Sequence, residues 1–178
     1  MSDYTANIAP FIDVIFYVTG EYGEIRPYET HVGLDIATSS PENLYSILDG
    51  VVINKDYSPL RGNYIVVKGD NNYAFLYQHM QDPSPLNIGD RVQIGQFVGV
   101  EGTTGQVTGL HLHIEMQYLE NRNWNYSNDI SYYINPAEYM GFPNTSGISV
   151  YYDGTPIFPK KNYKKWLELK NKRIIIKI

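Results

Sequence analysis

The sequence predicts a mainly β protein whose antiparallel sheet folds into a sandwich or an open barrel. Three observations support this class. Glycine and proline recur at short spacing between Gly20 and Gly109. The runs between them are short and rich in β-branched and aromatic residues, as strands are. Helix signals are scarce: a single turn is expected at 39–43, and a short helix at 136–140, which begins with proline.

The expected strands follow the chain in a regular order. They cover residues 48–53, 64–68, 73–77, 97–100 and 110–116. Turn residues separate these runs, and short strands at regular spacing are typical of antiparallel sandwiches and barrels.

Composition suggests one domain, residues 1–142, followed by a different C-terminal part. Residues 143–147 have a linker composition, and residues 143–178 are expected to form this linker plus a short basic extension from an excised or accessory module. Within it we expect a strand pair around Asp153-Gly154, a lysine-rich amphipathic piece and an apolar end at 173–178. Residues 1–159 hold 6 basic and 18 acidic side chains, whereas residues 160–178 hold 8 basic and 1 acidic.

These features exclude several classes of function. The acidic main body does not fit nucleic-acid binding through a positive surface. The first residues show no signal peptide, and no segment predicts a membrane span. The chain has no cysteine, so disulfides and thiolate metal sites are excluded. A zinc site would need nitrogen and oxygen ligands, which suit a catalytic site better than a structural one.

The segment Leu110-His-Leu-His-Ile-Glu-Met116 carries two of the four histidines. On a strand, alternate side chains share a face, so His111, His113 and Glu115 lie on one side and the apolar residues on the other. From this motif alone, the two imidazoles fit either a shared site or a solvent-facing surface.

The segment His31-Val-Gly-Leu-Asp35 offers a second pair of metal-binding groups. Histidine and aspartate supply nitrogen and oxygen ligands. Gly33 between them suggests a close backbone approach rather than a smooth helix. An apolar segment follows Asp35, and a carboxylate near a core is costly unless it is paired or metal-bound. The fourth histidine, His79, ends a strand-like run and says little alone.

Together these motifs resemble, in order, those of the M23 zinc metallopeptidases, the lysostaphin-type cell-wall endopeptidases. His31-Val-Gly-Leu-Asp35 resembles the first metal motif, HxxxD, and Thr108–Glu115 resembles the closing HxH strand. Tyr77-Gln-His79 resembles the segment with a catalytic histidine, and Gly102-Thr-Thr-Gly105 part of the glycine-punctuated core. The likeness covers roughly residues 20–142 and uses all four histidines.

The resemblance implies a fold and a set of roles. The fold would be the lysostaphin-type barrel-sandwich, a duplicated hybrid motif with few short helices. His31, Asp35 and His113 would bind one zinc ion, and a water would occupy the fourth position. His111 is the expected proton acceptor, and His79 would help to stabilise the tetrahedral intermediate. Glu115 would either orient a histidine or be solvated. Tyr22 or Tyr28 would assist the oxyanion.

The implied function is zinc-dependent hydrolysis of a peptide bond in bacterial peptidoglycan, in a cross-bridge or a stem peptide. The alternative is a non-catalytic wall-binding or assembly protein, such as a phage tail component. Relatives of that kind typically lose a ligand, and this sequence keeps every position. The expected place of action is the cell wall, on the extracellular or periplasmic side. Without a visible export signal, we expect a phage-derived or virion-associated enzyme, or an excised domain. The basic extension would contact other virion or wall-binding modules.

Overall fold

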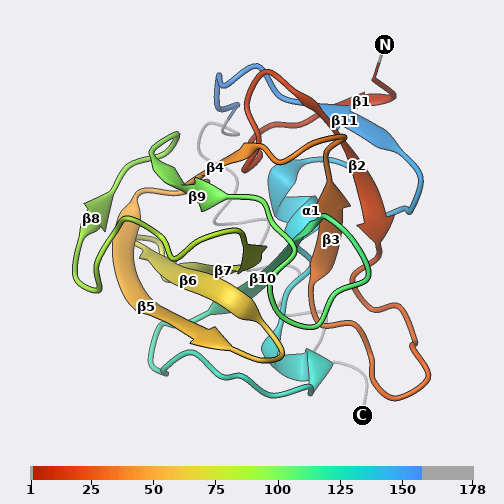
Figure 1. The fold of residues 1–178 in the computed structure, drawn as a ribbon. Coiled ribbons are helices and arrows are strands. Elements are labelled where there is room, and N and C mark those ends of the chain that lie inside the picture. Colours follow the sequence, from red (N-terminus) through yellow and green to blue (C-terminus); the bar gives the residue numbers. More distant parts are fainter. Residues whose placement is uncertain (1, 158–178) are drawn as a thin grey trace, which may run out of the picture.

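The structure, a computed structural model, describes residues 2–157 and contains two β-sheets (Figure 1). Nine strands form the large sheet, in the order β1-β11-β2-β3-β10-β7-β6-β5-β8, and β4 and β9 form a separate pair. The strands are β1 (Tyr4–Thr5), β2 (Ile15–Gly20), β3 (Leu34–Ala37), β4 (Asn43–Tyr45), β5 (Gly50–Ser58), β6 (Gly62–Gly69), β7 (Tyr73–Met80), β8 (Arg91–Val92), β9 (Phe97–Val100), β10 (Leu112–Tyr118) and β11 (Ser149–Tyr151).

The mainly β class predicted from the sequence is confirmed. All pairings in both sheets are antiparallel except that of β1 with β11, which is parallel and makes the large sheet mixed. The five expected strands appear as β5, β6, β7, β9 and β10, with ends that differ by a few residues. Figure 1 shows β5, β6 and β7 as long curved neighbours, with the β4–β9 pair above them.

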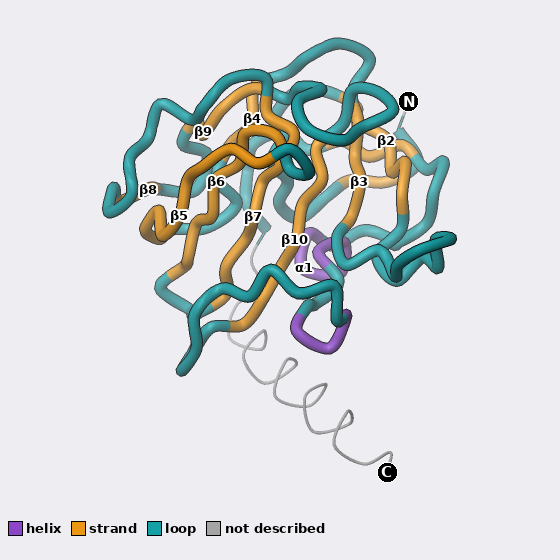
Figure 2. Tube along the Cα trace, turned by 60° about the horizontal axis from the view of Figure 1, so that its bottom comes forward, coloured by secondary structure: helices purple, strands orange, loops and turns teal. Residues whose placement is uncertain are grey.

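The two helix predictions have different outcomes. The helix at 136–140 is confirmed as α1 (Pro136–Met140), where the Asn135 side chain caps the start and Gly141, at φ 86°, ends it. The helical turn expected at 39–43 is wrong, because Asn43 begins β4 and pairs with Val100 of β9. A single 3-10 turn, η1 (Ile130–Tyr132), lies before α1 (Figure 2). Among residues 2–157, no helix is both long and apolar enough to cross a membrane.

The strand pair expected around Asp153-Gly154 is wrong. β11 lies between β1 and β2 in the large sheet, and residues 152–157 form no strand. β11 therefore pairs with these two N-terminal strands rather than with the second strand of a local hairpin. The domain end at residue 142 stays a prediction, and the basic extension and the apolar end at 173–178 lie outside the described residues.

The middle of the large sheet is buried on both faces, since every residue of β7 is buried. One face carries the main core, to which Phe75 and Tyr77 of β7 belong. The other face carries a smaller cluster around Leu76, which Trp124 and Tyr126 cover from the segment after β10. The same face also holds polar side chains towards one end of the strands, and these build the candidate site.

Candidate metal centre

The register of three neighbouring strands places polar side chains in one row. His113 of β10 pairs with Asp35 of β3 on one side and with Gln78 of β7 on the other. Side chains of directly paired residues lie on the same face about 5 Å apart. His31 lies three residues before β3 and reaches the same row. Residues far apart in sequence therefore converge because β3 and β10 are neighbours.

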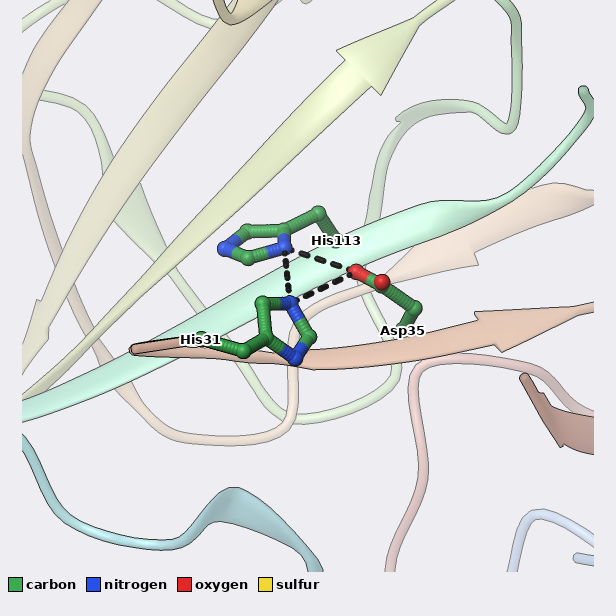
Figure 3. Close-up of side chains that lie close together, drawn as sticks. All are labelled: His31, Asp35 and His113. Atoms are coloured by element: carbon green, nitrogen blue, oxygen red, sulfur yellow. Dashed lines mark hydrogen bonds and ion pairs between the residues drawn. The ribbon is translucent and has the colours of Figure 1, made fainter. Parts of the chain in front are cut away.

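His31, Asp35 and His113 present three potential ligand atoms to one point (Figure 3). His31 Nε2 lies 3.1 Å from Asp35 Oδ1 and 3.0 Å from His113 Nδ1, and His113 Nδ1 lies 2.7 Å from Asp35 Oδ1. Ligands of a tetrahedral zinc, with bonds of about 2.0–2.1 Å, lie about 3.3–3.4 Å apart. All three residues are buried. The donor set and its spacing therefore fit a divalent metal such as zinc.

Short hydrogen bonds stabilise the charged forms of Asp35 and His113 in this cluster. Burial opposes ionisation of Asp35, but hydrogen bonds from His113 and His31 outweigh it and hold the pKa of that carboxyl well below its usual range. Burial likewise opposes the charge on His113, but hydrogen bonds to Asp35 and Glu115 raise its pKa to about 9. Without a metal, the buried aspartate is thus held as an ion pair with the imidazole.

Arg26 holds the second oxygen of Asp35. Its Nη2 donates to Asp35 Oδ2 at 2.8 Å, while its Nε donates to Glu24 Oε2 at 3.0 Å. Asp35 Oδ1 is consequently left to face the two histidines. A β-carbon on Gly20 would lie 2.4 Å from Asp35 Oδ2 and 2.6 Å from Arg26 Nη2, so a side chain there would displace this pair.

Gly33 has the close approach that the sequence predicts. A β-carbon there would lie 2.4 Å from His113 Nε2 and 2.8 Å from the Ile114 carbonyl oxygen. The absence of a side chain therefore allows the His113 ring to pack against the backbone that joins His31 to Asp35. His31 is fixed from its other nitrogen, since Nδ1 lies 2.6 Å from the Glu21 carbonyl oxygen and donates to it.

His79 and His111 form a second pair beside the first cluster, with ring centroids 4.9 Å apart. His79 Nδ1 donates to the Thr104 carbonyl at 2.9 Å, and His111 Nδ1 donates to the Gly109 carbonyl at 3.0 Å. These bonds leave an Nε2 lone pair on each ring. His111 Nε2 lies 3.8 Å from Asp35 Oδ1 and so faces the candidate metal position.

Burial and neighbouring charge keep His79 neutral. Burial is the main cause that lowers its pKa to about 4, and the adjacent His113 and His111 also lower it. The backbone of His79 has a φ of 62°, in the left-handed region that non-glycine residues rarely adopt. The β6–β7 register shifts here, and the His79 N–H donates to the Arg61 carbonyl at 3.0 Å. This irregularity turns the ring towards His111.

Glu115 is buried, only 2% exposed, so it is not solvated. Its Oε1 accepts a hydrogen bond from Gln78 Nε2 at 2.6 Å and lies 3.3 Å from His113 Nε2. The carboxylate therefore contacts the His113 nitrogen that faces away from His31 and Asp35. This geometry favours the first of the two sequence interpretations, a partner that orients a histidine.

A groove of about 560 Å³ opens over both clusters. All five predicted site residues line it. The other lining residues come from strands β7 and β10, the loop before β3, the β5–β6 turn, the loop before β10 and the segment after it. They include Glu24, Arg26, Glu29, Leu60, Arg61, Gln78, Gln106, Val107, Thr108, Glu115 and Asn128.

Neither candidate tyrosine lines this groove. The Tyr22 hydroxyl donates to the Tyr133 carbonyl at 3.1 Å, and burial is the main cause that raises its pKa to about 12. The Tyr28 side chain is fully exposed. The described conformation thus gives neither hydroxyl access to the candidate metal position.

Sequence reasoning missed Arg26 and Gln78 as parts of the site. A signal for Arg26 existed, since it is the one cation between residues 1 and 54, a few residues before the two ligand candidates. No local signal distinguishes Gln78, because its role follows only from the pairing of β7 with β10.

Comparisons with known proteins agree with the resemblance found in the sequence. A family model described as Peptidase family M23 matches residues 29–127. The chain is 37% identical to the peptidoglycan DD-endopeptidase ShyC of Vibrio cholerae over 52% of this chain and 21% of that protein. It is 38% identical to ShyA of the same organism over 48% of this chain and 20% of that protein. The chain thus matches about a fifth of the length of these curated relatives.

Solved structures show the same fold. A zinc-containing peptidase from Vibrio cholerae is 31% identical with a TM-score of 0.57, covering 64% of this chain and 36% of that one. The catalytic domain of the prophage-encoded M23 protein EnpA from Enterococcus faecalis is 28% identical with a TM-score of 0.59, covering 75% and 98%. The lysostaphin catalytic domain from Staphylococcus simulans is 24% identical with a TM-score of 0.57, covering 71% and 90%, and supports the lysostaphin-type fold.

Proposed function

The chain belongs to peptidase family M23, whose model matches residues 29–127, and from this we propose that it is a zinc-dependent endopeptidase of bacterial peptidoglycan. The observation that carries the proposal is the pair of clusters in one groove. Three buried ligand candidates lie beside two histidines whose Nδ1 atoms each contact a backbone carbonyl.

We assign His31, Asp35 and His113 as the ligands of one zinc ion. Each has a second contact on an atom that does not face the candidate metal position. These contacts come from the Glu21 carbonyl to His31, from Arg26 to Asp35 and from Glu115 to His113. Such contacts fix the orientation of ligands. A zinc ion bound there would lower the pKa of a water to about 7 and polarise the scissile carbonyl.

His111 is the proposed general base. The Gly109 carbonyl holds the proton on Nδ1, so Nε2 accepts a proton from the attacking water. Its side chain is more exposed than those of the ligand candidates, with 17% accessible, and it lines the groove. After it accepts the proton, the imidazolium can donate it to the leaving amine.

His79 has a related role. Its ring is neutral, and Nδ1 carries the proton that is donated to the Thr104 carbonyl. Nε2 is therefore an acceptor in the resting site. It can orient the water by accepting its second hydrogen. It can donate to the oxyanion of the tetrahedral intermediate only after a proton has reached Nε2. The stabilising role predicted from the sequence therefore depends on proton transfer within the pair.

The substrate and the place of action belong to the same proposal. The relatives named as peptidoglycan endopeptidases support a wall peptide as substrate and the cell wall as place of action. The likeness to the prophage-encoded EnpA domain supports an origin in a phage or prophage.

Purified walls of several cross-link types test this function. We expect the zinc-loaded protein to lower the turbidity of at least one wall type, a chelator to stop it and added zinc to restore it. Mass spectrometry of the soluble products identifies the bond that is cut. A zinc-loaded, folded protein that releases no new peptide ends from any wall type would contradict the proposal.

A further inference from the structure

Arg61 lies in the turn between β5 and β6 and lines the groove. Its backbone carbonyl accepts the His79 N–H at 3.0 Å. The Arg61 backbone is therefore anchored next to the candidate catalytic pair, and within residues 2–157 no ion pair joins the Arg61 side chain to a ligand candidate. The residue is partly exposed to the groove.

The two arginines of the groove differ in their partners. Arg26 is neutralised by Glu24 and Asp35, at 3.0 and 2.8 Å. Within residues 2–157, Arg61 forms no ion pair with a carboxylate. Arg61 thus carries the groove's one uncompensated arginine charge in the described part of the chain.

The Arg61 guanidinium is held in a fixed orientation. It lies over the Tyr126 ring, 4.7 Å from the centroid, and the Tyr126 hydroxyl accepts a hydrogen bond from Asn54 at 2.6 Å. One face of the guanidinium is therefore occupied, and its in-plane N–H donors remain. The buried Nε has no hydrogen-bond partner among the described residues. A buried donor without a partner is unusual and suggests an absent one.

We propose that Arg61 is a specificity-determining residue that binds a carboxylate of the substrate peptide. The proposal rests on the proposed function of the groove. A stacked guanidinium offers a planar pair of donors that matches a carboxylate. Glu29, which forms no ion pair within residues 2–157, lines the groove from the loop before β3. The sheet order places β3 and the β5–β6 turn on opposite sides of β10 and β7. Glu29 repels a carboxylate on its side, so the anionic end of the peptide binds at Arg61.

Chemically amidated walls provide the test. Purified walls of each cross-link type are divided, and in one half the carboxylates are converted to amides with carbodiimide and ammonia. Lysis rates at limiting wall concentration are then compared for the zinc-loaded wild type, Arg61→Gln and Arg91→Gln. Arg91 is a matched control, since it is an exposed arginine paired with Asp70 outside the groove.

We expect the wild type and Arg91→Gln to lyse amidated walls at least about tenfold more slowly, as expected for loss of a charged hydrogen bond. Arg61→Gln should lyse both preparations at the wild-type rate for amidated walls. Its zinc content should equal that of the wild type, because within residues 2–157 no ion pair joins Arg61 to a ligand candidate. If Arg61→Gln does not fold, Arg61→Lys, which keeps the charge but loses the planar fork, replaces it and should lose most of the preference.

Two failures are distinguishable. Equal wild-type rates on untreated and amidated walls, or an Arg61 variant that keeps the full wild-type preference, would overturn the role of Arg61 alone. A wild type that lyses neither preparation of any wall type would contradict the peptidase function itself, and the inference would fail with it.

Discussion

Asp35 makes different contacts through its two carboxylate oxygens. Oδ1 faces His31 and His113, whereas Oδ2 accepts from Arg26. A carboxylate that is held at one oxygen cannot rotate freely. Its other oxygen therefore points in a fixed direction, which favours metal binding. Arg26 is therefore a positioning residue for a ligand.

Replacing Arg26 tests this role. Arg26→Met should weaken zinc binding by about 10–100-fold, the usual effect of removing a partner that orients a ligand. Arg91→Met, which removes an exposed ion pair with Asp70, should leave zinc affinity unchanged. Competition with a chromophoric chelator measures both, and Arg26→Lys should recover part of the loss. Equal zinc affinity in Arg26→Met and the wild type would contradict the assignment.

Glu101 is fully buried, and its burial raises the pKa of its carboxyl. Thr38 Oγ1 lies 2.6 Å from the Ser40 carbonyl oxygen and also donates a short hydrogen bond to Glu101 Oε2. The Thr38 N–H donates to Glu101 Oε1 at 3.2 Å. Burial therefore outweighs the hydrogen bonds from Thr38, which favour the ionised carboxylate.

The raised pKa of Glu101 predicts a pH-dependent stability. A group with a raised folded-state pKa contributes its full stability below its ordinary pKa, about 4.3 for glutamate, and loses it as pH rises through the raised value. Glu101→Gln removes this loss, since an amide can donate to Thr38 and has no charge. Urea unfolding should show the variant more stable than the wild type at pH 8 and similar at pH 4. A variant equally destabilised at both pH values would contradict the raised pKa of Glu101.

At the scale of elements, two loops meet through glycines near the histidine pair. A β-carbon on Gly105 would lie 2.3 Å from the Gly62 nitrogen and 2.7 Å from the Leu60 carbonyl oxygen. These are backbone atoms and cannot move aside as a side chain can. The contact places Thr104, whose carbonyl holds the His79 ring, against the β5–β6 turn. The loop before β10 and this turn therefore position His79 together.

The variant Gly105→Ala tests the close packing of these two loops, and Gly89→Ala is its control. Both glycines have positive φ, 84° and 95°, but a β-carbon on Gly89 would meet nothing within 4 Å. Gly89→Ala should cost only the backbone strain, about 1–2 kcal/mol of unfolding free energy. Gly105→Ala should cost clearly more and reduce wall lysis as well. Equal losses of unfolding free energy in urea would refute the close packing of these loops.

The elements were only partly predictable from local patterns. The strands β5, β6, β7, β9 and β10 carry apolar and β-branched runs, and all five were predicted. The strand β4, which begins at Asn43, was not predicted, because it is defined by its pairing with β9. The position of β11 between two N-terminal strands likewise depends on contacts across more than 130 residues, which no local pattern encodes.

At the scale of the whole molecule, the candidate site was largely predictable because its residues lie in two short motifs. HxxxD and HxH each place their groups through local spacing, and the register of β3 with β10 brings the motifs together. The supporting contacts of Arg26 and Gln78 were not predictable, since they depend on side-chain directions in the folded sheet. The expected oxyanion role of Tyr22 or Tyr28 rested only on proximity in sequence. In the structure, the Tyr22 hydroxyl instead donates to the Tyr133 carbonyl.

The central claim is that His31, Asp35 and His113 bind the zinc on which wall hydrolysis depends, while His111 acts without binding it. The most direct measurement compares His113→Ala and His111→Ala for zinc content by elemental analysis and for lysis of purified walls. We expect His113→Ala to lose both, and His111→Ala to keep about one zinc and lose about 10²–10⁴-fold in lysis rate. A His113→Ala protein that still binds zinc and lyses walls at the wild-type rate would contradict the account.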